Sequence, residues 1–168
     1  MQRRLVVISP CRDEAQLVQF TLDSVVKQTY LPHLWIIVDD GSRDRTAEIV
    51  ERYAAKYPWI RLIRWERGGS RQLGPGVVNA FCAGLEALGD EPFDVIAKLD
   101  CDLEFGAETF AAILRLFDDP KVGMASGTTL LLLKGELVPE RCEDYHVPGQ
   151  AKFYRRECFR DLGILCLA

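Results

Sequence analysis

Two aspartates stand one residue apart directly after an apolar run, in the string Asp100-Cys101-Asp102. Once the chain leaves a strand and turns, carboxylates at this spacing can both reach a single site. Hard divalent cations such as Mg²⁺ and Mn²⁺ prefer oxygen ligands, and they commonly share one or two carboxylates with the phosphates of a substrate. The pair therefore predicts a cation site beside a diphosphate. A solvated loop or a helix cap is the alternative, because the pattern is common.

A second acidic cluster, Asp39-Asp40-Gly41-Ser42, also follows an apolar run. A carboxylate at such a point can accept hydrogen bonds from a nucleobase or a ribose. The alternative is a tight turn, in which Gly41 takes a positive φ and the aspartates accept backbone N–H groups. The segment 10–14 is a weaker candidate, since its acidic residues Asp13 and Glu14 also suit the start of a helix.

A glycine-rich stretch, Gly68 to Gly76, contains Arg71. The backbone amides of such a loop can surround a phosphate, and an arginine can pair with it. An ordinary surface loop is the alternative.

The pattern of apolar side chains predicts the elements that would position these residues. Short apolar runs predict buried strands, and apolar residues at spacings of three and four predict helices. The expected strands cover 5–8, 35–38, 60–65, 94–99 and 122–126, and the expected helices run through 15–25, 47–57, 78–88 and 110–117. This alternation predicts an α/β fold, with a mostly parallel sheet and helices on both faces. In such sheets ligands bind at the carboxyl ends of the strands, where all these clusters lie.

Beyond about residue 130 the pattern weakens. Lys134-Gly135-Glu136 predicts a turn, 150–154 a short strand and 157–162 a helical turn. Asp44 or Ser42 is expected to cap the helix over 47–57.

Composition excludes several classes of protein. The 168 residues suit one domain spanning 1–168. A net charge of −4 leaves no chain-wide basic field, so we expect no nucleic-acid partner. Six cysteines without a C-x-x-C pair suit free thiols in a reducing compartment rather than a zinc site. No apolar run is long enough for a secretory signal or a transmembrane segment, which predicts a cytoplasmic location.

Three strings together resemble a known family: Pro10-x-x-Asp13-Glu14, Val38-Asp39-Asp40-Gly41-Ser42-x-Asp44-x-Thr46 and Asp100-x-Asp102. The segment 150–163 adds an arginine pair before a short helix and a glycine. The combination resembles the family 2 glycosyltransferases of the GT-A (Rossmann-like) fold over residues 4–163. The resemblance implies that 4–127 bind a nucleotide sugar and that 128–168 form an incomplete acceptor-side part.

The resemblance also implies roles for single residues. Asp40, together with Asp39, would contact the base, commonly uracil or guanine. Asp100 would lie near the ribose and the metal, and Asp102 would coordinate the Mg²⁺ or Mn²⁺ that bridges the diphosphate. The other residues expected around the nucleotide sugar are Pro10, Arg12, Glu14 and Arg71.

The activity implied is transfer of a sugar, with inversion, from a UDP- or GDP-linked donor to an acceptor hydroxyl. A carboxylate would deprotonate the hydroxyl, and the metal would stabilise the departing diphosphate. The resemblance places this reaction in glycan or cell-envelope synthesis at the inner face of a membrane, with a glycan or a lipid-linked molecule as acceptor.

Two features depart from the family's pattern. Cys82 stands where many relatives have an asparagine, and the family's catalytic base normally lies farther downstream than residue 168. We therefore expect a truncated chain without a catalytic base. A non-catalytic nucleotide-sugar-binding module is one alternative, because it would share every donor-side residue. A sugar-phosphate nucleotidyltransferase is another, but it would need a glycine-rich loop at 10–14, where no glycine stands.

Overall fold

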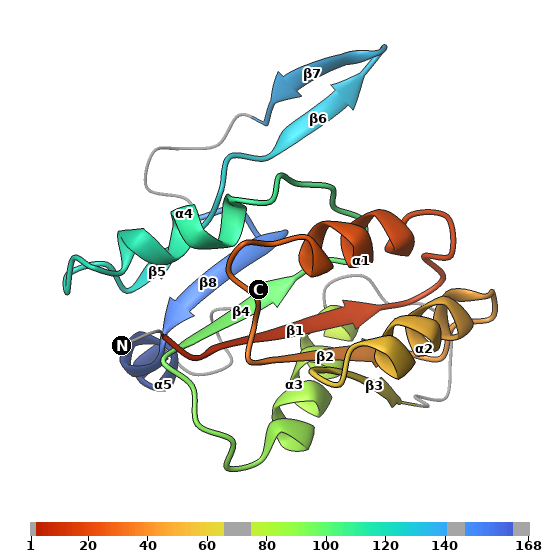
Figure 1. Cartoon of the computed structure of the whole chain (residues 1–168), viewed down its shortest axis with the longest axis horizontal. Coiled ribbons are helices and arrows are strands. Elements are labelled where there is room, and N and C mark those ends of the chain that lie inside the picture. The colour runs from red at the N-terminus through yellow and green to blue at the C-terminus, as the bar shows by residue number, and fades with distance from the viewer. Residues whose placement is uncertain (1–2, 66–74, 141–146, 163–168) are drawn as a thin grey trace.

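The computed structural model describes residues 3–65, 75–140 and 147–162, and a six-stranded sheet lies at its centre (Figure 1). The strands, in order across the sheet, are β3 (Ile60–Arg64), β2 (Leu34–Asp39), β1 (Leu5–Cys11), β4 (Val95–Leu99), β8 (Ala151–Arg155) and β5 (Met124–Ala125). The first four in this order run parallel, and β8 is antiparallel to both of its neighbours. The expected α/β fold with a mostly parallel sheet is confirmed.

Helices cover both faces of the sheet because its central strands are apolar on both sides. One face carries α1 (Val18–Val26), α2 (Thr46–Lys56) and α4 (Thr109–Leu116), and the other carries α3 (Pro75–Leu88) and α5 (Arg156–Leu162). Along β1, the fully buried Leu5 and Val7 belong to the core between the sheet and α1, α2 and α4. Val6 and Ile8 belong to the core on the other face, beneath α3 and α5. This alternation follows from the two-residue period of a strand.

Helix α3 approaches β1 very closely at Gly84. A Cβ atom added there would lie 2.5 Å from Cγ2 of Ile8 and 3.1 Å from Cγ2 of Val38. Only a residue without a side chain fits this separation, so Gly84 allows α3 to pack this closely against β1 and β2.

The start of helix α1 was predicted wrongly. The acidic pair Asp13 and Glu14 led us to expect the helix to begin beside them, but it begins at Val18. The N–H groups of residues 13–15 instead donate to side chains of the segment 42–46, which joins β2 to the start of α2, and Asp13 takes a φ of +54°. These long-range hydrogen bonds hold residues 13–15 in a turn, so α1 begins only at Val18.

The insertion of β8 between β4 and β5 was not predicted, although the strand itself was expected. Strands β6 (Leu130–Leu133) and β7 (Glu136–Pro139) form a separate hairpin that extends away from the sheet (Figure 1). The turn expected at Lys134 to Glu136 is confirmed, and in it both Lys134 and Gly135 take a positive φ. All eight residues of the two strands are exposed.

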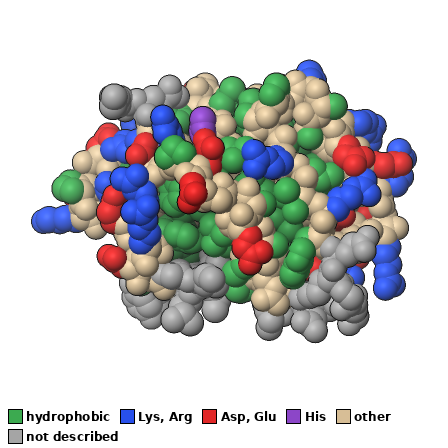
Figure 2. All heavy atoms as spheres, turned by 90° about the horizontal axis from the view of Figure 1, so that it is seen from below, with side chains coloured by type: hydrophobic (Ala, Val, Ile, Leu, Met, Phe, Trp, Pro, Cys, Tyr) green, Lys and Arg blue, Asp and Glu red, His purple; other side chains and the backbone are tan. Residues whose placement is uncertain are grey.

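Seen from the side of α3 and α5, acidic and basic side chains are interspersed, with apolar side chains between them (Figure 2). Five apolar residues pack only partly buried against the core on the α3 and α5 face: Ile63, Trp65, Ala83, Leu85 and Phe93. Within the described residues, no helix combines the length and the hydropathy needed to cross a membrane.

Candidate functional site

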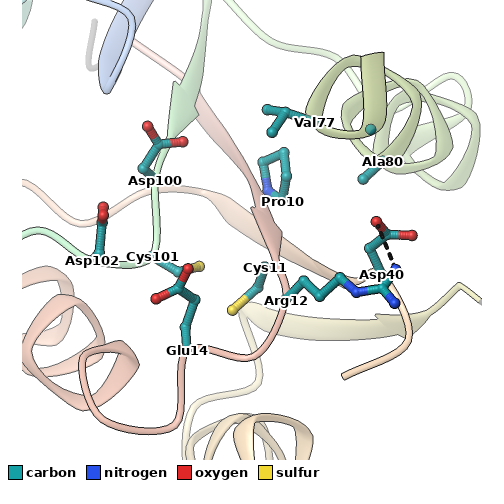
Figure 3. A pocket seen from close by; sticks show the side chains of 11 residues that line it. Pro10, Cys11, Arg12, Glu14, Asp40, Val77, Ala80, Asp100, Cys101 and Asp102 are labelled. Atoms are coloured by element: carbon teal, nitrogen blue, oxygen red, sulfur yellow. Dashed lines mark hydrogen bonds and ion pairs between the residues drawn. The ribbon is translucent and has the colours of Figure 1, made fainter. Parts of the chain in front are cut away.

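A pocket lies at the carboxyl ends of β1, β2 and β4, beside the first turns of α3 (Figure 3). Its described lining residues are Pro10, Cys11, Arg12, Glu14, Asp40, Gly76, Val77, Ala80, Asp100, Cys101 and Asp102. Figure 3 shows Arg12 and Asp40 on one side and Asp100 and Asp102 on the other, with Pro10 and Cys11 between them. The acidic residues that follow two different strands therefore meet at one cavity.

The described residues enclose about 160 Å³ of this cavity. Sites that hold a whole small molecule usually measure roughly 300–1,000 Å³. A ligand the size of a nucleotide sugar would therefore extend beyond these residues.

Most of the expected site residues line the pocket, and two do not. Those that it brings together are Pro10, Arg12, Glu14, Asp40, Asp100 and Asp102. Asp39 is buried outside the pocket lining, and Arg71 lies outside the residues that the structure describes, as does most of the glycine-rich stretch.

The neighbours Asp39 and Asp40 differ in what they contact. Asp39, the last residue of β2, pairs with Cys11 in the sheet, and its Oδ1 accepts the N–H of Ser42 at 3.2 Å. Asp40 lines the pocket beside Ala80 of α3. The chain leaves β2 after Asp39, so Asp40 belongs to the turn that borders the pocket. Gly41 has a φ of +69°, so the turn expected here is confirmed as well.

A buried ion pair forms one wall of the pocket. Nη1 of Arg12 lies 3.5 Å from Oδ2 of Asp40, and both side chains are 8% exposed. Nε of Arg12 also lies 3.8 Å from a carboxylate oxygen of Asp13. Charges removed from water are costly unless they are paired, so the guanidinium and the Asp40 carboxylate support each other in this position.

Four hydrogen bonds join the turn after β1 to the turn after β2. They run from Asp13 N to Ser42 Oγ (3.0 Å), from Glu14 N to Thr46 Oγ1 (2.8 Å), from Ala15 N to Asp44 Oδ2 (3.0 Å) and from Arg43 N to Asp13 Oδ1 (2.7 Å). We call this set of contacts the turn clamp. It gives the S-x-D-x-T spacing a physical reason, because three side-chain oxygens at alternate positions accept three successive N–H groups. The clamp thereby orients the segment that carries Arg12 and Glu14.

Asp44 serves both the clamp and helix α2. Its Oδ1 accepts the N–H of Thr46, the first residue of the helix, at 2.9 Å. The N-cap position itself is held by Arg45, which makes no side-chain capping hydrogen bond, so neither Asp44 nor Ser42 is the N-cap residue that the sequence predicted. Burial acts to raise the pKa of this carboxyl, but the hydrogen bonds from Thr46 and Ala15 outweigh it, so the pKa is lowered from 3.8.

Asp100 and Asp102 are in different surroundings. Burial raises the pKa of Asp100, the nearby Asp102 adds to this, and the ammonium of Lys98 opposes it. Lys98 forms an ion pair with Oδ1 of Asp100 and donates to the carbonyl of Gly149 at 2.9 Å. Asp102 is exposed and accepts no hydrogen bond from any described residue.

The charges of the pocket favour a cation. Its described lining carries the carboxylates of Glu14, Asp40, Asp100 and Asp102, against the cations Arg12 and the adjacent Lys98, so negative charge is in excess. No group of three or more His, Cys, Asp or Glu among the described residues could hold a metal ion by itself. Mg²⁺ and Mn²⁺ do not require such a cage, since they bind one or two carboxylates plus phosphate oxygens. The residues present therefore fit a cation held jointly with a phosphate ligand.

Several residues of the site were missed by the sequence analysis. Val77 and Ala80 of α3 line the pocket, and Lys98 supports it from β4. A signal for Lys98 existed: it is the only charged residue in the strand 95–99, and a buried lysine needs a partner.

Comparison with known proteins identifies the family. The model of the family described as "Glycosyl transferase family 2" matches residues 6–162. A poly-beta-1,6-N-acetyl-D-glucosamine synthase of Staphylococcus epidermidis is 30% identical over 107 residues, which is 59% of this chain and 26% of that protein.

Two solved structures share the fold. One is the mannosyltransferase PcManGT from Pyrobaculum calidifontis in complex with GDP-Man and Mn²⁺, with a TM-score of 0.69 and 24% identity over 97% of this chain. The other is Staphylococcus aureus TarS 1-349 in complex with UDP-GlcNAc, with a TM-score of 0.64 and 21% identity over 94% of this chain. The chain spans 47% of the length of each.

Proposed function

The chain belongs to glycosyl transferase family 2, and we propose that its pocket binds a nucleoside-diphosphate sugar together with Mg²⁺ or Mn²⁺. The protein transfers the sugar to an acceptor hydroxyl with inversion at the anomeric carbon. The observation that carries this proposal is the meeting of Asp40, Asp100 and Asp102 in one pocket of a chain of this family.

The relatives support the choice of donor and cation. PcManGT was solved with GDP-Man and Mn²⁺, and TarS 1-349 with UDP-GlcNAc. A pocket with excess negative charge would repel a bare diphosphate, whereas a divalent cation between the two compensates both. The synthase among the relatives supports an acceptor in glycan or cell-envelope synthesis.

The proposal divides the pocket into two parts. Asp40, supported by Arg12, accepts hydrogen bonds from the base. On the opposite side, Asp100 lies toward the ribose and Asp102 provides the exposed carboxylate for the cation. Pro10 and Glu14 border the nucleotide between these parts. When bound, the cation supplies positive charge that stabilises the diphosphate as it leaves the sugar. We assign the catalytic base that would deprotonate the acceptor hydroxyl to none of the described residues.

Calorimetry with UDP and with GDP, each with and without Mn²⁺, tests the binding half of the proposal. We expect binding of one of the two nucleotides that depends on Mn²⁺ and that Asp102→Asn weakens at least about tenfold, since the exposed carboxylate is the proposed ligand. Asp90→Asn, which removes an exposed carboxylate outside the pocket lining, is the matched control. Absence of Mn²⁺-dependent binding to either nucleotide contradicts the proposal.

Turnover separates a transferase from a binding module. Release of free sugar or of nucleoside diphosphate from UDP- and GDP-sugars, measured with and without candidate glycan acceptors, reports transfer or slow donor hydrolysis. Binding without any release of diphosphate would favour the non-catalytic module, because the two alternatives share the same donor-side residues.

A further inference from the structure

Lys98 is a buried charge next to the pocket that the proposed chemistry does not use. It lies in β4 between Ala97 and Leu99, which belong to the apolar core beneath α1 and α4, so its side chain points to the opposite face. Only 9% of Lys98 is exposed. A lysine is almost never buried to this degree without a partner that compensates its charge.

The Lys98 ammonium contacts two groups. It forms an ion pair with Oδ1 of Asp100, and it donates to the carbonyl of Gly149 at 2.9 Å. The backbone N–H of Asp100 in turn donates to the carbonyl of Gln150 at 2.8 Å. Asp100 is therefore held at its main chain and at its side chain by groups that also fix the 149–150 turn before β8.

This arrangement treats the two aspartates of the pair unequally. Lys98 compensates the charge of Asp100 and occupies one of its oxygens. Among the described residues, no hydrogen bond or ion pair reaches the carboxylate of Asp102, which remains exposed. Of this pair, an approaching cation thus meets one carboxylate that no described residue contacts and one whose charge an ammonium already compensates, and that ammonium repels the cation.

We propose that Lys98 is a positioning residue that makes cation binding depend on the diphosphate. By holding Asp100 and adding a positive charge, it keeps the affinity of the empty pocket for a bare divalent cation low. A diphosphate brings its own negative charge and oxygen ligands, so the cation binds well only together with it. The inference rests on the proposed function in one respect, namely that the ligand which binds together with the cation is a nucleoside diphosphate.

Electron paramagnetic resonance of free Mn²⁺, titrated with the protein alone and then with UDP or GDP present, tests the proposal directly. Lys98→Met is expected to bind Mn²⁺ alone about tenfold more tightly than the wild type, because a positive charge near the dication is removed. The ratio between the Mn²⁺ affinities with and without nucleotide should fall by a similar factor. Structural damage would instead weaken Mn²⁺ binding in both conditions.

Matched variants separate the contact from net charge. Lys98→Arg keeps the charge and should resemble the wild type. Lys152→Met removes a lysine that stands opposite Lys98 on β8 and has no contact with Asp100, so it should change Mn²⁺ affinity less than about twofold. An effect of Lys152→Met equal to that of Lys98→Met overturns the proposal, as does Lys98→Met binding Mn²⁺ alone no better than the wild type.

A second comparison covers the case in which Lys98→Met fails to fold with Asp100 left unpaired. In an Asp100→Asn background no buried carboxylate is stranded, and adding Lys98→Met should still tighten Mn²⁺ binding about tenfold. An unchanged affinity in that background refutes the repulsion. The proposed function is judged separately, by whether the wild type binds UDP or GDP with Mn²⁺ at all, whereas the role of Lys98 is judged on Mn²⁺ alone.

Discussion

Thr46→Val removes a single hydroxyl from the turn clamp at nearly constant volume. Thr46 is fully buried, its Oγ1 accepts the N–H of Glu14 at 2.8 Å, and its hydroxyl hydrogen bonds to Oδ1 of Asp44. Valine fills the same space but neither accepts nor donates. The substitution therefore tests whether the clamp holds the segment that carries the pocket residues.

The expected cost follows from which group loses its partner. Asp44 is exposed, so water can replace the lost hydroxyl there. The N–H of Glu14 is partly buried, and a buried donor left without this acceptor costs about 1–3 kcal/mol. We expect a loss of about 2 kcal/mol in the free energy of unfolding, which for a domain of this size lowers Tm by roughly 4–8 °C.

Urea unfolding followed by circular dichroism measures the loss, and calorimetry with nucleotide and Mn²⁺ measures the effect on the pocket. Thr46→Ser is the control, because it keeps the hydroxyl and removes one buried methyl group, which costs about 0.8 kcal/mol. It should also keep the nucleotide affinity that Thr46→Val weakens. A valine variant as stable as the wild type, or a serine variant that loses as much, would refute the role assigned to this hydroxyl.

Three further outcomes are expected. Gly84→Ala should destabilise the fold by about 1–3 kcal/mol in urea unfolding, because its methyl group would lie 2.5 Å from Cγ2 of Ile8. Arg12→Met should cost about 3–5 kcal/mol by the same measurement and weaken nucleotide binding, since it strands the buried Asp40 carboxylate. The lowered pKa of Asp44 means that its hydrogen bonds stabilise the fold fully above the ordinary value of 3.8 and are lost as pH falls below it, which unfolding measured from pH 6 to pH 2 will show as a decline.

Each of these outcomes has its own control. Gly106→Ala adds the same methyl group where nothing lies within 4 Å, and equal losses at both glycines would contradict the close approach of α3. Arg12→Met combined with Asp40→Asn should recover part of the stability lost by the single variant. Asp44→Asn should flatten the acid decline, and an unchanged pH profile would argue against its contribution.

The sequence alone was sufficient for most of the elements up to about residue 125, apart from the start of α1, and for the edge at which the site lies. Short apolar runs such as 35–38 are typical of strands buried on both faces, and the helical spacing between such runs predicts helices that cover both faces of the sheet. These are local properties, because each depends on residues a few positions apart. The positive φ of Gly41 is local in the same way, since it follows from the turn chemistry of Asp39 to Ser42.

The tertiary structure alone decided which distant segments meet. The insertion of β8 beside β4 brings Gly149 to Lys98 across 51 positions of sequence, and the turn clamp joins Glu14 to Thr46 across 32. The S-x-D-x-T spacing suits such acceptors, but it does not specify which distant segment supplies the N–H groups. The choice of neighbouring strand is made by competition for burial over the whole chain. The late start of α1 at Val18 has the same kind of cause, because the N–H groups of residues 13–15 donate to side chains of the distant segment 42–46.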